Sequence, residues 1–108
     1  MANTFKLKTK ANVGVTTSNV YTVPSATTTV VIGVTLANTT GSSINVGVGV
    51  TRASTDNVKL MKNVPIPQGS SFEFMAGNKV VLETTGTLTA ESDVSNSLDV
   101  ALTIMEIT

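Results

Sequence analysis

The chain has 108 residues, of which 41% are hydrophobic and only 13% are charged, and its formal net charge is zero. This length suits one domain, so we expect a single β-sandwich domain over residues 1–108 with one hydrophobic core. A neutral chain lacks the basic balance that is typical of nucleic-acid binding, and we therefore expect no nucleic-acid partner.

The sequence contains no His and no Cys. Without them the usual general base near neutral pH, the thiolate nucleophile and the main protein ligands of transition metals are missing. We therefore expect no enzymatic activity, no catalytic or metal-binding residues and no cofactor. No apolar run is long enough for a membrane span or a signal peptide, so we also expect no membrane partner.

Apolar and polar residues alternate with a period of two along most of the chain, and Val and Thr are abundant, which favours strands over helices. Clusters of Gly, Pro, Asn and Ser divide the chain into short runs. The predicted strands are Thr4–Ala11, Asn19–Val23, Thr28–Asn38, Ser43–Thr51, Asn57–Val64, Ser70–Met75, Lys79–Glu83, Thr87–Glu91 and Leu98–Ile107. About eight to nine short strands without helices predict an all-β fold, an antiparallel β-sandwich that is Ig-like or jelly-roll-like.

In the first predicted strand, Phe5 and Leu7 alternate with lysines, which predicts one buried apolar face and one wet face. A terminal strand is the best candidate for an edge that pairs with, or is exchanged with, another subunit. Lys6, Lys8 and Lys10 on the expected polar face are therefore candidate partner contacts. The alternative is that these lysines only protect the edge against aggregation.

Further along, Tyr21 stands before Pro24, and we expect its hydroxyl to bond a carbonyl of that turn. The run Asn38-Thr39-Thr40 matches a glycosylation pattern, but without a secretion signal we interpret it as a hairpin turn.

A strand with Ile44, Val46, Val48 and Val50 on one face carries Gly47 and Gly49 on the other. Glycine weakens a strand, so some contact should compensate for it. One interpretation is that a neighbouring strand of the same fold crosses closely there. The other makes Gly47 and Gly49 a docking strip for another chain, and we keep both residues as candidate partner contacts.

In the second half of the chain, two prolines flank Ile66 and exclude a central ladder there, which predicts a crossing between sheets or a corner. Phe72 and Phe74 share one face of a predicted strand, so we expect both in the core. A turn is predicted at 76–78.

The charges are divided between the two halves of the chain, +4 over residues 1–55 and −4 over residues 56–108. Neighbouring strands can interleave these charges within one molecule. Alternatively, copies of the chain pair head to tail, basic edge to acidic edge, with an affinity that falls as salt rises.

The segment from Val20 to Gly41 reads Val-Tyr-Thr-Val-Pro-Ser-Ala-Thr-Thr-Thr-Val-Val-Ile-Gly-Val-Thr-Leu-Ala-Asn-Thr-Thr-Gly. It resembles a segment of small β-sandwich virion structural proteins of tailed bacteriophages, including phages of cyanobacteria. The resemblance rests on the Tyr-Thr-Val-Pro start, the small polar turn, the Val-rich strand and the final Asn-Thr-Thr. It names no functional residues.

This resemblance implies a non-enzymatic virion structural protein, foremost a capsid decoration (cement) protein that binds and stabilises the outside of the head. The expected partners are the major capsid protein or other virion proteins, and copies of the chain in a trimer or dimer. The expected location is the virion, assembled in the host cytoplasm. The alternatives are a tail, baseplate or fibre-associated protein, and a host-surface or carbohydrate adhesion module, against which the absence of Trp counts.

Overall fold

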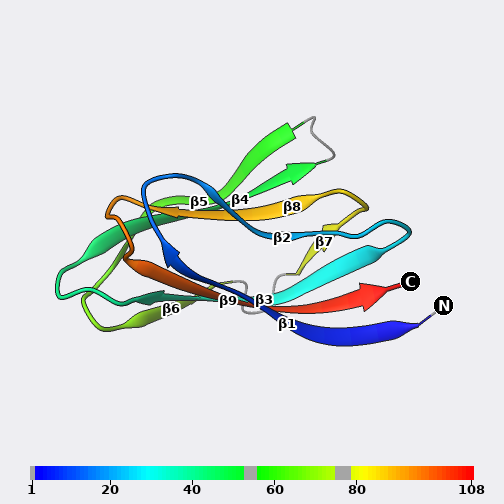
Figure 1. Cartoon of the computed structure of the whole chain (residues 1–108), viewed down its shortest axis with the longest axis horizontal. Helices are drawn as coiled ribbons and strands as arrows, with labels where there is room; N and C mark the ends of the chain where they lie inside the picture. The colour runs from blue at the N-terminus through cyan, green and yellow to red at the C-terminus, as the bar shows by residue number, and fades with distance from the viewer. Residues whose placement is uncertain (1, 53–55, 75–78) are drawn as a thin grey trace.

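A computed structural model describes residues 2–52, 56–74 and 79–108, and within them the chain forms nine strands and no helix (Figure 1). The strands are β1 (Asn3–Val13), β2 (Ser18–Thr22), β3 (Thr28–Asn38), β4 (Ile44–Arg52), β5 (Asp56–Ile66), β6 (Ser71–Phe74), β7 (Val80–Leu82), β8 (Thr87–Ser92) and β9 (Leu98–Ile107). Every predicted strand is confirmed, and the bounds of β3 and β9 match the prediction. The turn predicted at 76–78 lies outside the described residues.

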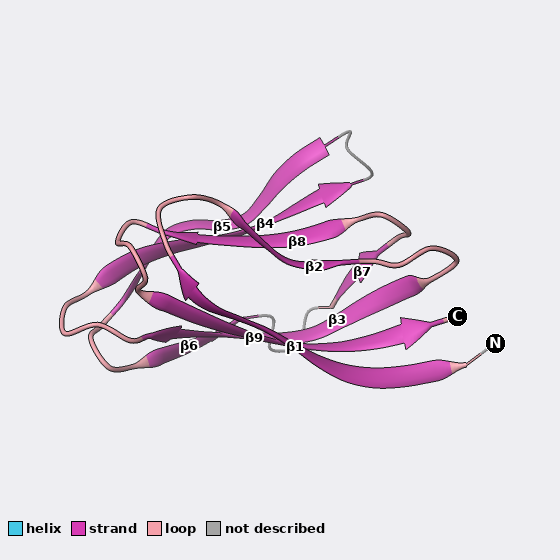
Figure 2. Ribbon diagram, viewed as in Figure 1, coloured by secondary structure: helices cyan, strands magenta, loops and turns pink. Residues whose placement is uncertain are grey.

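The strands form two antiparallel sheets that pack face to face (Figure 2). Sheet A has the order β1-β9-β3-β6, with β7 also paired to β3, and sheet B has the order β2-β8-β4-β5. The first four strands alternate between the sheets, and the last two do so again. This confirms the sandwich and gives it jelly-roll order rather than the Ig-like order, in which the first two strands share a sheet.

The core is made by the alternating apolar residues that face the space between the sheets. Val46 and Val48 of β4, and Leu102 and Ile104 of β9, are almost fully buried. The prediction that Phe72 belongs to the core is wrong. Phe72 lies on the inner face of the edge strand β6, yet it is 39% exposed. An edge strand has no further neighbour to cover a large side chain, so pattern alone overestimated its burial.

The chain crosses from sheet B to sheet A after Ile66. The crossing was predicted, but β5 continues through Pro65, which pairs with Asn45. A proline is tolerated there because β5 is the edge strand of sheet B. No further strand lies beside it to accept a hydrogen bond from a backbone N–H at position 65, which proline lacks.

The segment 38–43 connects β3 of sheet A to β4 of sheet B, so the predicted hairpin turn is wrong. Asn38 is buried, and its amide group donates to the carbonyls of Ser42, Ile66 and Pro67 at 2.8, 2.9 and 3.1 Å. Its side-chain oxygen accepts from the backbone N–H of Thr40 at 2.9 Å. One side chain therefore ties together two connections between the sheets, β3–β4 and β5–β6.

We expect Asn38→Ala to lower the free energy of unfolding by about 2–3 kcal/mol, because buried carbonyls lose their donor. Urea unfolding monitored by circular dichroism measures this change. Asn45→Ala, at an exposed position in β4, is the matched control and should stay within about 0.5 kcal/mol of the parent. Equal, small effects of both substitutions would contradict the role assigned to Asn38.

Candidate interaction surfaces

The sequence pattern predicted that the lysines of β1 point away from the sandwich, but they do not. Lys6 pairs with Ile104 in the ladder, and directly paired residues share a face, so Lys6, Lys8 and Lys10 lie on the inner side of sheet A. The ammonium of Lys6 lies 2.8 Å from a carboxylate oxygen of Glu106, whose side chain is only 6% exposed.

Glu106 is the centre of a polar cluster between the two sheets. Its second carboxylate oxygen accepts a hydrogen bond from the hydroxyl of Tyr21 in β2, and that hydroxyl lies 2.8 Å from the hydroxyl of Thr29. Tyr21 therefore bonds a carboxylate and not, as predicted, a turn carbonyl. The hydrogen bond from Lys6, followed by that from Tyr21, lowers the pKa of Glu106 below 4.5. Burial raises the pKa of Tyr21 to about 12.

The apolar residues of β1 consequently face solvent. Phe5 and Leu7 are 70% and 66% exposed, which corrects the expectation that they belong to the core. Phe5 begins a row of paired residues that runs across the outer face of sheet A through Met105 and Val30 to Val81, which is 60% exposed. A row of four large apolar side chains on an outer face is unusual for an isolated monomer.

The register of β1 produces this exposure. A slip of one residue against β9 would turn Phe5 and Leu7 inward and the lysines outward. The ion pair between Lys6 and Glu106 opposes that slip, and so does the bulge before Val13, where Asn12 has a φ of 58°. The outward position of Phe5 is therefore a determined feature of the fold.

The outer face of sheet A divides into two ends. The large end carries Phe5, Val30, Val81, Met105 and Ile107, the small end carries Thr9, Ala11, Thr35, Ala37 and Ala101, and Leu7 lies in the row between them. The small end is hollowed by a shallow depression of about 230 Å³ over Ala101 and its neighbours. Among the described strand residues of this face, the charged ones are Glu73 and Asp99, both toward the small end.

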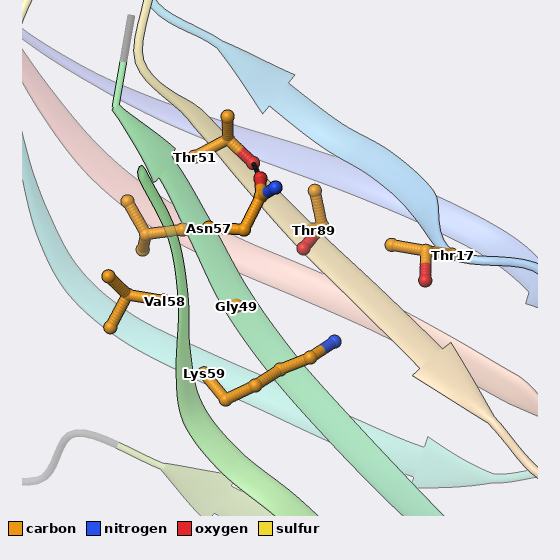
Figure 3. Close-up of a pocket in the computed structure, with 8 residues that line it drawn as sticks. Thr17, Gly49, Thr51, Asn57, Val58, Lys59 and Thr89 are labelled. Carbon is orange, nitrogen blue, oxygen red and sulfur yellow. Dashed lines mark hydrogen bonds between the residues drawn. The ribbon is translucent and has the colours of Figure 1, made fainter. Parts of the chain in front are cut away.

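The outer face of sheet B is polar instead. One row across its four strands consists of Thr22, Thr87, Thr51 and Asn57. Within it, the hydroxyl of Thr51 donates to Asn57 at 2.7 Å, the contact drawn in Figure 3. The two outer faces of the sandwich therefore differ sharply in chemistry.

Gly47 and Gly49 lie on this polar face, but they are buried and do not form a bare strip. A Cβ atom at Gly49 would lie 3.0 Å from the carbonyl oxygen of Val58 and 3.2 Å from the hydroxyl of Thr89. Lys59 of β5 reaches past Gly49 toward Glu91 of β8, and these two side chains form an ion pair over the strand. Neighbouring strands of the same sandwich thus fill the space above both glycines.

A polar hollow of about 350 Å³ remains beside Gly49 (Figure 3). Hydroxyls of Thr17, Thr51 and Thr89 line it, together with Asn57 and Lys59. Val50 and Val58 also line it, but no aromatic residue does, so the hollow offers hydrogen bonds and no stacking surface.

Charges from the two halves of the sequence are interleaved in space. Lys6 contacts Glu106, and Arg52 lies 3.7 Å from Glu83 and 3.6 Å from Asp56. These contacts favour the first interpretation of the divided charge, in which one molecule compensates its own charges.

Across the described ranges, no three acidic side chains gather as a metal-binding group. Nor do these ranges contain a helix long and apolar enough to span a bilayer.

No protein-family model matches the chain, and no curated protein matches it. Among solved structures, it is similar to a chain of the Bacillus endospore appendages, which form a family of disulfide-linked pili. The TM-score is 0.60 with 12% sequence identity, and the alignment covers 99% of this chain and 87% of the other. At this identity the likeness shows the fold, and it agrees with a β-sandwich over the whole chain.

The ion pair of Glu106 should make stability depend on pH. The folded-state pKa is lowered, so the contribution is fully present above pH 4.5 and is lost as the pH falls through the folded-state pKa. We expect Glu106→Gln and Lys6→Met to reduce this acid-dependent loss, measured as the urea midpoint at successive pH values. Lys10→Met removes a cation from the same face farther from Glu106 and should behave as the parent. Parallel pH profiles of the parent and Glu106→Gln would contradict this account.

The two glycines can be distinguished by substitution. Gly49→Ala should lower the free energy of unfolding by about 1–2 kcal/mol, because the new methyl group meets backbone at 3.0 Å. In Gly47→Ala the nearest atom to the new methyl group is 3.3 Å away, and this contact is offset because alanine reduces the conformational freedom of the unfolded chain. We therefore expect the free energy of unfolding to change by less than about 1 kcal/mol. Thermal unfolding measures both. If both variants are stable but fail to assemble, the docking interpretation of the strip is the correct one.

Proposed function

We propose that this chain is a non-enzymatic structural subunit of a virion that works by contact with copies of itself and with other virion proteins. The single observation that carries the proposal is the outward row of Phe5, Met105, Val30 and Val81. Burial of such a row against a neighbour stabilises an assembly by about 25 cal/mol per Å² of apolar surface. The register of β1 maintains the row although a slip would bury Phe5.

Within a virion, decoration of the outside of the head is the first candidate. Its support is the resemblance of Val20–Gly41 to phage virion proteins, together with a single sandwich that has two chemically distinct outer faces. One face can contact a neighbouring copy, while the polar face and the edges remain for the major capsid protein or for water. Jelly-roll domains occur in viral capsid proteins and also in lectins, so the fold is compatible with this role without implying it.

A filament-forming role in a tail, fibre or pilus is the second candidate, and the likeness to a pilus subunit favours it. Those pili are disulfide-linked, whereas these 108 residues contain no Cys. Disulfides between these residues therefore cannot join copies of this chain, and the apolar row is the contact that we propose in their place.

The number of copies in purified particles tests the proposal. Quantitative mass spectrometry of phage particles, with the major capsid protein as internal standard, should find hundreds of copies for head decoration. Tens of copies in multiples of three or six would instead assign the chain to the tail. Absence from particles would overturn the virion role.

A further inference from the structure

The outer face of sheet A is complementary to itself. Its large end and its small end lie at opposite ends of the same strands, on either side of the row that joins Leu7, Thr103 and Gly33. Met105 is two residues from Thr103 in one direction, and Ala101 is two residues from it in the other. Phe5 and Thr9 have the same relation to Leu7.

We propose that two copies of this chain pair through this face, about a two-fold axis that runs across the strands along the Leu7–Thr103–Gly33 row. The axis places Met105 over the partner's Ala101 and Phe5 over the partner's Thr9. Leu7 lies on the axis and meets Leu7 of the second copy. The depression over Ala101 then receives the large end of the second copy. Such an isologous contact closes as a dimer and leaves sheet B free. The inference deepens the proposed function and rests on it only for the biological setting.

Two-fold axes in two directions could pair this face with itself, across the strands or along them, and the acidic residues of the face favour the axis across the strands. An axis along the strands would place small end on small end, and would bring Glu73 and Asp99 of both copies to the same end of the interface. Like charges opposed across an interface cost free energy. The axis across the strands keeps the acids of the two copies apart, because it sets Glu73 over the partner's Val81 and Asp99 over the partner's Ile107.

The area is sufficient for a specific dimer. The face is about nine residues long at about 3.4 Å per residue and about four strands wide at about 4.8 Å per strand, which gives roughly 600 Å² per copy. The pair would therefore bury about 1,200 Å², the lower limit for stable complexes. An overlap of the large ends alone would bury about half of that. Only the arrangement that covers both ends reaches the required area.

Sedimentation equilibrium from micromolar to millimolar concentration tests the pairing. The parent should form a dimer, and Met105→Ala and Ala101→Met should each weaken it about tenfold or more. The double variant moves the large side chain to the other end of β9 and should recover most of the affinity, because each contact is again large on small. Val15→Ser, at an apolar residue exposed on the loop before β2, is the control and should dimerise as the parent. Dimerisation unchanged in both single variants, or no dimer at all, would overturn the proposal.

Crosslinking tests the axis directly, since the sequence contains no Cys. Thr103 is exposed and would face its own copy across the axis, so Thr103→Cys should give a covalent dimer with a short bismaleimide. Thr22→Cys, exposed on the outer face of sheet B, should give no covalent dimer. The reverse result would place the contact on sheet B and overturn the proposal.

The two proposals fail in different ways. If the chain is abundant in particles but monomeric by sedimentation, the proposed function stands and the proposed dimer is overturned. If the chain forms the dimer with the Thr103 crosslink but is absent from particles, the proposed dimer stands and the virion role is overturned. Apolar pairing should also persist as salt rises, whereas head-to-tail pairing of charged edges should weaken.

Discussion

The hydrogen-bonded ion pair between Lys6 and Glu106 decides which face of the first strand meets water. Glu106 is buried between the sheets, where an ionised carboxylate must be paired, and Lys6 and Tyr21 supply its partners. Because side chains alternate along a strand, holding Lys6 inward holds Phe5 and Leu7 outward. The contact thereby adds Phe5 and Leu7 to the apolar residues that β3, β7 and β9 present on the outer face of sheet A.

That outcome gives the sandwich two different surfaces. Sheet B presents threonines and asparagines with a lysine–glutamate pair over its glycines, a surface that water solvates well. Sheet A presents large apolar side chains at one end and small ones at the other. A subunit that must hold neighbours on one side and face solvent or a different protein on the other needs such a division. The proposed function rests on this division and not on a pocket.

The strands were predictable because their signals are local. Alternation, β-branched residues and turn residues act within a few positions, and all nine predicted strands are present. Predictions that depended on a distant partner were less successful. Tyr21 bonds a carboxylate of the last strand, Asn38 spans two connections between sheets, and Phe72 lies at an edge that its own pattern does not indicate.

The all-β class and the positions of the strands could be predicted because composition and short-range pattern carry that information. The pattern also indicated that β1 has an apolar and a basic face. Which face lies inside depends on Glu106, which is at the other end of the chain and meets Lys6 only when β1 pairs with β9. The tertiary structure likewise decided that Gly47 and Gly49 are covered, since the side chains above them come from β5 and β8. Long-range pairing, which no local pattern encodes, created the surface on which assembly is proposed to depend.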